Sequence, residues 1–327
     1  MTTDRHDDRP ATTAHPDGSP TAMTSPRALH TPHMEHYTFV LEDQPYLGYF
    51  QYGGEKTPVY HTDRHGFRIT PGPGGQRATI GDDRPEGPAR LLAGSSAVFG
   101  VGATGDAATI SARLWNAYAP RLPWLNLAGQ SHNSAQELLL LTLFQHELPA
   151  LEDIVLLSGV NNLVLSRLPE EKQGRHGAFF DCGPAPESVP PPERRVAHAT
   201  ELTLRHLRGW KTLADGLGAR LSFVLQPLAP WVREQPLPLE RALFEELDEV
   251  SNFRRFHHDI STLAVGRSYA QQLAAGCAAL GVPFLDMNVA LGSVAAPEDW
   301  LFIDRVHCTD LGYDLVARQL ADRLDLT

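Results

Sequence analysis

Three polar side chains of the sequence could together activate a hydroxyl group for attack on a carbonyl carbon. Asp304 and His307 form the only Asp-x-x-His sequence of the chain, and Ser96 lies in the segment GSSAVFG. A serine hydroxyl is a weak nucleophile near neutral pH, so it needs a base, and the base needs a third group that fixes its tautomer. A carboxylate three residues before an imidazole can reach Nδ1 while Nε2 faces the serine. We therefore expect a Ser-His-Asp relay for acyl transfer, with Ser95 as the alternative nucleophile.

Acyl transfer also requires hydrogen-bond donors for the oxyanion that develops on the attacked carbonyl. Asn161 follows Gly159 in the segment SGVNN and offers a side-chain amide. The backbone amides of Ser96 and Ser131 complete the expected oxyanion hole. For a lone loop asparagine, a turn-forming role is the alternative. We interpret His132, next to Ser131, as a polar loop residue.

These candidate residues follow short apolar segments that alternate with helical patterns. The alternation predicts a parallel β-sheet covered by helices, in which the carboxyl ends of the strands form one ligand crevice. We expect five strands, at residues 91–93, 124–127, 154–157, 221–225 and 283–285. We expect helices at residues 109–118, 134–146, 196–217, 260–280 and 311–324. The loops after the strands then bring the serine, asparagine, aspartate and histidine candidates to one rim.

Four segments in order, GSSAVFG, NLAGQSHNSAQEL, GVNN and DRVH, resemble the sequence blocks of the SGNH, or GDSL-type, hydrolase superfamily. The resemblance covers about residues 89–327, and TDRHGFR at residues 62–68 is loosely similar to segments that precede the core of some members. It implies a nucleophile at Ser96 with Asp304 and His307 as its partners, and oxyanion donors at Ser96, Ser131 and Asn161. Ser95, Ser131 and Asn162 differ from the residues usual in the family, which bears on substrate range more than on catalysis.

We predict a three-layer α/β/α domain over residues 87–327, with a flavodoxin-like parallel five-stranded sheet in the order 2-1-3-4-5. Residues 1–34 are rich in Thr, Pro, Asp and His and predict a disordered tail. Residues 35–86 predict a small ancillary β-rich segment and linker. The Pro-rich segment 166–195 indicates a surface loop or flap, and segment 226–259 could form a lid. Within that lid we expect His257 and His258 on a solvated helix face.

Charge and cysteine content narrow the classes of partner. The 327-residue chain has a formal net charge of -11, which disfavours nucleic acid and anionic membrane surfaces. The three cysteines, Cys182, Cys277 and Cys308, are widely spaced, which indicates free thiols, with Cys308 as a small apolar residue near the site. The first residues lack the apolar run of a secretory signal or membrane anchor, so we expect a cytoplasmic protein. The balance of 25 Arg against 3 Lys is typical of GC-rich bacterial genomes.

Together these features predict a serine esterase or acylhydrolase. Its substrate would be an acyl ester, such as an acetyl ester, of a small molecule, sugar or secondary metabolite, cleaved through an acyl-enzyme. We expect no metal and no organic cofactor. Two alternatives stay open: an acyltransferase that uses the same triad, and a binding module that keeps the fold without catalysis. The oligomeric state and the role of residues 35–86 are left open by the sequence.

Overall fold

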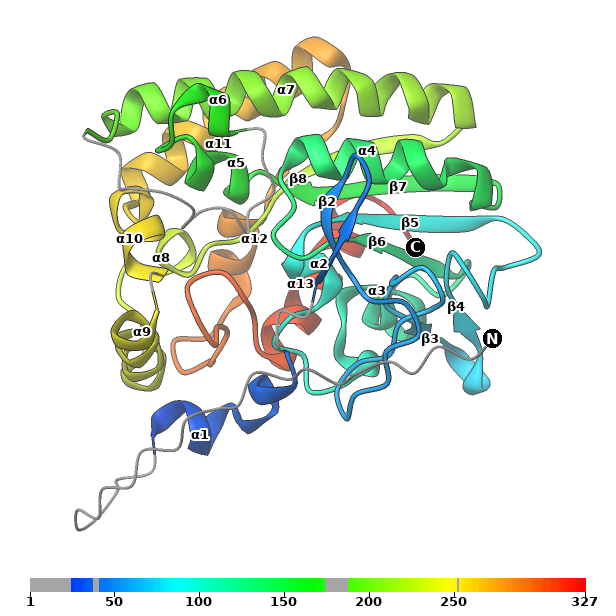
Figure 1. Ribbon diagram of the computed structural model, residues 1–327, viewed down its shortest axis with the longest axis horizontal. Helices are drawn as coiled ribbons and strands as arrows, with labels where there is room; N and C mark the ends of the chain where they lie inside the picture. The colour runs from blue at the N-terminus through cyan, green and yellow to red at the C-terminus, as the bar shows by residue number, and fades with distance from the viewer. Residues whose placement is uncertain (1–24, 38–40, 174–187, 252) are drawn as a thin grey trace, which may run out of the picture.

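A five-stranded parallel sheet forms the centre of the computed structural model, which describes residues 25–37, 41–173, 188–251 and 253–327 (Figure 1). Its spatial order is β6-β5-β7-β8-β9, which is the predicted order 2-1-3-4-5 when the strands are numbered along the chain. The strands are Ala89–Gly94 (β5), Trp124–Ala128 (β6), Leu151–Ser158 (β7), Arg220–Leu225 (β8) and Phe284–Asp286 (β9). The predicted fold class and strand order are therefore confirmed.

The strand register places the carboxyl ends of β6, β5 and β7 level with one another. Gly94, the last residue of β5, lies opposite Ala128 of β6 and Leu157 of β7. The backbone of β5 also approaches β7 closely here, because a Cβ built on Gly94 would lie 2.3 Å from the Leu157 carbonyl oxygen. The loops that follow these three strands consequently start from one edge of the sheet.

Helices cover both faces of the sheet, which gives the three layers (Figure 1). One layer contains Ser134–Phe144 (α4), Val160–Leu165 (α5), Pro192–Leu217 (α7) and Leu263–Leu280 (α11). The other contains Ser96–Phe99 (α2), Ile110–Arg113 (α3), Met287–Val294 (α12) and Asp310–Arg323 (α13). Among the helices of the described residues, none is both long and apolar enough to cross a membrane.

Helix α7 illustrates how the sequence specifies this layer. Val196, Leu207, Trp210 and Ala214 recur at helical spacing and are buried against the sheet layer. Gly218 ends the helix in the left-handed conformation, with φ 71°. The predicted helix is confirmed, and it begins four residues earlier than expected because a proline is well tolerated in the first turn, where its missing N–H has no intrahelical partner.

The helix expected at residues 109–118 divides into two parts. Helix α3 ends at Arg113, and residues Leu114–Tyr118 (η4) form a π-helix. The Asn116 side chain donates to the Ala112 carbonyl at 2.8 Å, four residues earlier. A side chain that enters the main-chain ladder in this way is a known cause of local widening of a helix.

The segment before the sheet forms two short antiparallel hairpins. They pair Leu41–Gln44 (β1) with Gly48–Gln51 (β2) and Thr70–Pro71 (β3) with Arg77–Ala78 (β4). The segment PVYHT forms isolated bridges instead of a strand. Phe67 packs edge-on against Phe144 at the end of α4, with 4.8 Å between ring centroids. The β-rich lead-in is thus built onto the main domain and shares its core.

Part of the expected N-terminal tail is helical. Residues Pro26–His30 (α1) lie within the expected tail, residues 1–34, and Pro32–His36 (η1) begins in it and ends two residues beyond it, while residues 1–24 lie outside the described residues. The backbone amide of Arg27 donates to Glu246 Oε2 at 2.9 Å, and the Ser25 hydroxyl also bonds this carboxylate. The prediction of a tail was therefore wrong for these residues, because their docking partner lies some 220 residues away along the chain and leaves no local signal.

The two segments proposed as flap and lid are only partly helical. Residues Glu170–Gln173 (α6) begin the first segment, and residues 174–187 of it lie outside the described residues. The second segment contains Ala229–Val232 (α8), Pro238–Val250 (α9) and Phe253–His257 (α10). Short 3-10 helices complete the elements, at Pro73–Gly75 (η2), Asp106–Ala108 (η3), Gln145–Glu147 (η5) and His258–Ile260 (η7).

Candidate active site

The candidate nucleophile lies at a sharp turn between strand β5 and a short helix, α2. Strand β5 ends at Gly94, Ser95 is the residue before the helix, and Ser96 is the first residue of α2. Gly100 ends α2 after a single turn in the left-handed conformation, with φ 88°. Ser96 is 7% exposed, so its hydroxyl sits in a largely desolvated setting at the carboxyl edge of the sheet.

His307 bridges the two other candidate residues of the relay. Its Nε2 lies 2.8 Å from Ser96 Oγ, and its Nδ1 lies 2.8 Å from Asp304 Oδ2. With the Nδ1 proton donated to the carboxylate, Nε2 is the nitrogen that accepts the serine proton. The structure therefore brings together the three residues singled out by the sequence, although the serine is 211 positions from the histidine.

Asp304 is held as a buried carboxylate. Its second oxygen, Oδ1, accepts hydrogen bonds from the backbone amides of Val306 at 2.7 Å and His307 at 2.8 Å. Burial alone would raise the pKa of Asp304, but the charge and hydrogen bond of His307, together with these two amides, lower it to about 2. The carboxylate therefore stays ionised over the whole neutral range and fixes the orientation of the imidazole.

The two other candidate donors come from the strands on either side of β5. Ser131 follows β6 and has φ 60°, and Asn161 follows β7 in the first turn of α5. The Asn161 side chain donates to the carbonyl of His132 at 2.7 Å, which joins the two loops. A primary amide has two N–H groups, so this bond leaves one for a ligand. Neither Ser131 nor Asn161 forms a hydrogen bond to Ser96 among the described residues.

Asn162 has a structural role that sequence reasoning missed. Its side chain accepts from the Ser134 backbone amide at 3.1 Å and donates to Ser134 Oγ and Thr203 Oγ1, both at 2.6 Å. Ser134 Oγ in turn lies 2.7 Å from His206 Nδ1. Asn162 thereby ties the loop after β7 to α4 and α7. The difference from the family pattern at this position was the only signal that could have drawn attention to it.

Neither a protein-family model nor a curated protein matches the chain. Solved structures do match its fold. Its structural neighbours include GDSL-type lipases, acylhydrolases and acetylesterases. At 12–14% identity this likeness concerns the fold alone.

Three of these neighbours show the extent of the match. A member of the lipolytic G-D-S-L family from Veillonella parvula is 14% identical, and the match covers 72% of this chain and 97% of that one, with a TM-score of 0.47. Est24, a carbohydrate acetylesterase from Sinorhizobium meliloti, is 12% identical, with coverage of 73% and 99% and a TM-score of 0.45. A GDSL-like lipase from Bacteroides thetaiotaomicron is 14% identical, with coverage of 73% and 87% and a TM-score of 0.42.

Two histidines differ from their expected settings. His257 is buried, stacks on Phe253 with 4.3 Å between ring centroids, and has Nδ1 2.9 Å from the Phe253 carbonyl oxygen. Burial lowers the pKa of His257 to about 4. The prediction of a solvated face was therefore wrong for His257, whereas His258 is exposed. His132 is also buried and packs beside Phe50, with 5.7 Å between ring centroids.

The two cysteines among the described residues, Cys277 and Cys308, are poorly suited to act as nucleophiles. Cys308 and Cys277 are free and buried, and burial raises the pKa of each thiol, that of Cys277 to about 12. A thiol is a poor nucleophile until it ionises. Cys182 lies outside the described residues. Within the described ranges, no three His, Cys, Asp or Glu side chains are arranged to hold a metal ion.

Proposed function

We propose that the protein is a serine-dependent esterase or acylhydrolase with Ser96 as its nucleophile. The observation that carries the proposal is the pair of 2.8 Å contacts that His307 makes, one with Ser96 Oγ and one with Asp304 Oδ2. A buried serine, imidazole and carboxylate in this order supply a nucleophile, a base and a group that orients the base. The roles of the residues follow from this geometry.

In the proposed reaction, His307 Nε2 takes the Ser96 proton as Oγ attacks the ester carbonyl carbon. The tetrahedral intermediate collapses when the protonated imidazole returns that proton to the departing alcohol, and the acyl group stays on Ser96. Water then attacks the acyl-enzyme with His307 again as the base, which releases the acid and restores the serine. Asp304 remains ionised and stabilises the imidazolium in both halves of the reaction.

The oxyanion of each tetrahedral intermediate would lie between three donors. We assign them to the backbone amides of Ser96 and Ser131 and to the free N–H of the Asn161 side chain. The bond from Asn161 to His132 supports this assignment, because it fixes the amide without using both of its protons. Donors that are already oriented cost no reorganisation when the charge develops.

For the substrate we propose an acyl ester of a small molecule, a sugar or a secondary metabolite. The formal net charge of -11 supports a substrate that is not a polyanion, because a chain of this charge repels one. An acetyl ester is the simplest member of this class and the natural first probe.

The proposal is tested by comparing two neighbouring serines with short p-nitrophenyl esters and a fluorophosphonate probe. Ser96→Ala should abolish both turnover and covalent labelling, since Ser96 Oγ is the only hydroxyl of the described residues within hydrogen-bond distance of His307 Nε2. Ser95→Ala is the matched control, because Ser95 belongs to the same turn yet caps no amide with its side chain, and it should keep most of both. Turnover or labelling that survives Ser96→Ala would overturn the proposal. Product analysis with added alcohols then separates hydrolysis from acyl transfer.

A further inference from the structure

The guanidinium of Arg68 is fully buried and binds the carboxyl end of helix α2, the helix that begins with Ser96. Arg68 belongs to the β-rich segment 35–86 before the sheet, which we call the lead-in. Arg68 Nη1 donates to the carbonyl oxygens of Phe99 at 3.1 Å and Gly100 at 2.8 Å, at the point where α2 ends. Nη2 donates to the Val59 carbonyl at 2.7 Å, and Nε forms an ion pair with Asp106 at 2.7 Å. The Arg68 side chain has no exposed surface. The planar fork of arginine allows all these bonds at once, which the single ammonium of lysine cannot do.

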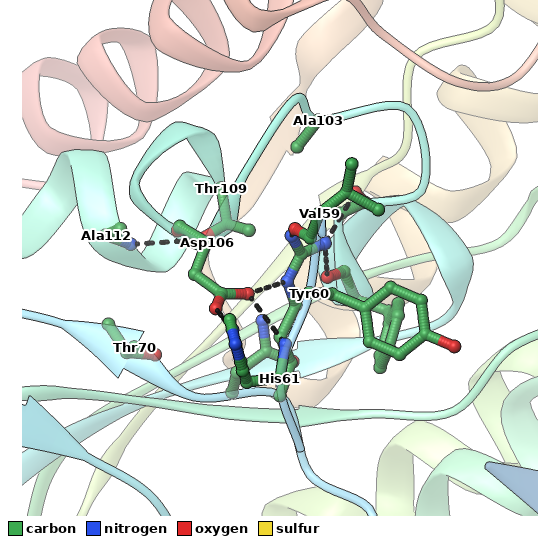
Figure 2. A network of polar contacts seen from close by, with 12 residues as sticks. Val59, Tyr60, His61, Thr70, Ala103, Asp106, Thr109 and Ala112 are labelled. Carbon is green, nitrogen blue, oxygen red and sulfur yellow. Dashed lines mark hydrogen bonds and ion pairs between the residues drawn. The ribbon is translucent and has the colours of Figure 1, made fainter. Parts of the chain in front are cut away.

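The partner carboxylate of Arg68 is itself held in place. Figure 2 shows Asp106 facing His61, and Asp106 Oδ2 lies 2.7 Å from His61 Nδ1 while Oδ1 accepts the His61 backbone amide at 3.3 Å. The Asp106 backbone carbonyl accepts a bond from the Thr109 hydroxyl at 2.9 Å. The guanidinium is therefore fixed from the lead-in and from the loop before α3, so its position does not depend on the nucleophile helix alone.

The lead-in also holds the loop that follows the nucleophile helix. The Tyr37 hydroxyl lies 3.0 Å from the Gly100 carbonyl oxygen and 2.6 Å from that of Ala103, and it accepts a bond from Arg68 at 3.1 Å. His33 Nε2 lies 2.9 Å from the Gly102 carbonyl oxygen. Several carbonyls of loop 100–103 are thus bound by residues that precede the loop by more than 30 positions along the chain.

The same loop packs directly against the segment that carries the base. A Cβ built on Gly102, which has φ 98°, would lie 2.6 Å from Ile303 Cδ1 and 2.8 Å from the Cys308 carbonyl oxygen. Ile303 immediately precedes Asp304, and Cys308 immediately follows His307. Loop 100–103 is therefore a spacer between the helix that presents the serine and the turn that presents the imidazole.

From this chain of contacts we infer that Arg68 is a positioning residue for the proposed reaction: it fixes the distance between Ser96 and His307 through loop 100–103. The inference rests on the proposed function. Arg68 reaches the reacting atoms only through the main chain of residues 99–103, so its loss should lower kcat and leave KM nearly unchanged. Displacements of about 1 Å can reduce a rate by about 100-fold.

The test compares two buried arginines that differ in their distance from the nucleophile. Arg68→Lys keeps the positive charge but removes the fork, and it should lower kcat and the rate of fluorophosphonate labelling by about tenfold or more. Arg90→Lys is the matched control, because Arg90 is equally buried and ion-paired with Asp153 at 3.0 Å, near the opposite end of β5. It should lower the melting temperature but change kcat less than about twofold. Both are assayed well below their own melting temperatures.

A milder variant covers the case in which Arg68→Lys does not fold. Tyr37→Phe removes one hydroxyl and keeps the ring, so it should fold and lower kcat about threefold with KM unchanged. The inference is overturned if a folded Arg68→Lys or Tyr37→Phe protein keeps its native kcat, or if Arg90→Lys loses as much kcat as Arg68→Lys. A native protein that the probe does not label on Ser96 would overturn the proposed function and, with it, the inference.

Discussion

Strand β5 has a buried polar cluster at each end, and the two clusters differ in how they are completed. At the amino end, Arg90 forms ion pairs with Asp153 at 3.0 Å and Glu152 at 2.9 Å, and it also bonds the Leu326 carbonyl. Hydrogen bonds from Arg121 and Arg90 lower the pKa of Glu152 to about 2. Each charged group at this end therefore has an oppositely charged partner, and we call such a cluster closed.

At the carboxyl end, the chain of hydrogen bonds runs from the amides of the 304–307 turn through Asp304 and His307 to Ser96 Oγ. It ends in a hydroxyl that needs to give up a proton, not in an opposite charge. Burial of polar groups therefore does not by itself indicate function, since both clusters are buried. What distinguishes the carboxyl end is that its last member, Ser96, is the nucleophile of the proposed reaction. Variants at the carboxyl end of β5 should consequently lose catalytic rate, whereas variants at the amino end should lose stability.

The largest expected effect is that of Asp304→Asn. The asparagine would present an N–H to His307 Nδ1 and favour the wrong tautomer of the imidazole, so kcat should fall by about 10⁴-fold. The fold should persist, because asparagine Oδ1 can still accept the amides of Val306 and His307. Steady-state kinetics combined with a melting curve would check both statements. If the variant retained more than a tenth of the native kcat, the proposed difference in function between the polar clusters at the two ends of β5 would be contradicted.

Local patterns allowed much of the fold and the arrangement of the relay to be predicted from the sequence. Asp304 and His307 lie in one turn, so their spacing alone indicates that they can touch. The approach of Ser96 follows from the rule that loops gather at the carboxyl ends of parallel strands. The alternating apolar segments predicted a parallel sheet, and its order, 2-1-3-4-5, was predicted once the family resemblance had been added to them; the structure confirms both.

What the sequence could not predict depends on contacts between distant segments. Arg68 reads as an ordinary polar loop residue, and only the packing of the lead-in onto the domain buries it beneath Phe99 and Gly100. His257 was assigned to solvent because its neighbours Arg254 and Arg255 are charged and indeed exposed, yet the turn of α10 places its own ring inward. For Arg68 the deciding partners lie outside the window that a sequence pattern covers, whereas the ring and carbonyl that His257 contacts belong to Phe253, four residues earlier.

The next effect in size is expected at Asn161. Asn161→Ala removes one proposed oxyanion donor and should lower kcat by about 10²- to 10³-fold with a small change in KM, because the bond strengthens only as the oxyanion develops. The variant also removes the bond to the His132 carbonyl. Thr203→Val is a useful control, since it disturbs the Asn162 network behind the same loop without touching a proposed donor, and it should keep kcat within about fivefold. An Asn161→Ala protein with native kcat would exclude the amide from the site.

At the closed end of β5 the expected effect is on stability alone. Arg90→Lys keeps a cation beside Asp153 but loses the bonds to Glu152 and Leu326, so the free energy of unfolding should fall by about 2 kcal/mol. Urea unfolding followed by circular dichroism would measure this change. An Arg90→Lys protein of native stability would show that the closed cluster contributes little, and that the two ends differ in function but not in stability.

The last prediction concerns a buried acid that belongs to neither cluster. Glu137 of α4 accepts a bond from the Ser158 hydroxyl at 2.6 Å, and burial raises the pKa of Glu137 to about 8. Between the ordinary glutamate pKa of about 4.3 and this value, the folded protein keeps a proton that the unfolded chain releases. Stability should therefore fall as the pH rises from about 5 to 8, by up to about 1.4 kcal/mol per pH unit from this group.

Glu137→Gln stays uncharged at every pH and can still accept the Ser158 hydroxyl, so it should lose this part of the pH dependence. Urea unfolding of the native and variant proteins at pH 5, 6.5 and 8 would measure the difference in slope. Above pH 8 the two slopes should converge, because Glu137 then ionises in the folded state as well. Parallel curves from pH 5 to 8 would mean that Glu137 is ionised in the folded protein over this range, which would contradict the prediction.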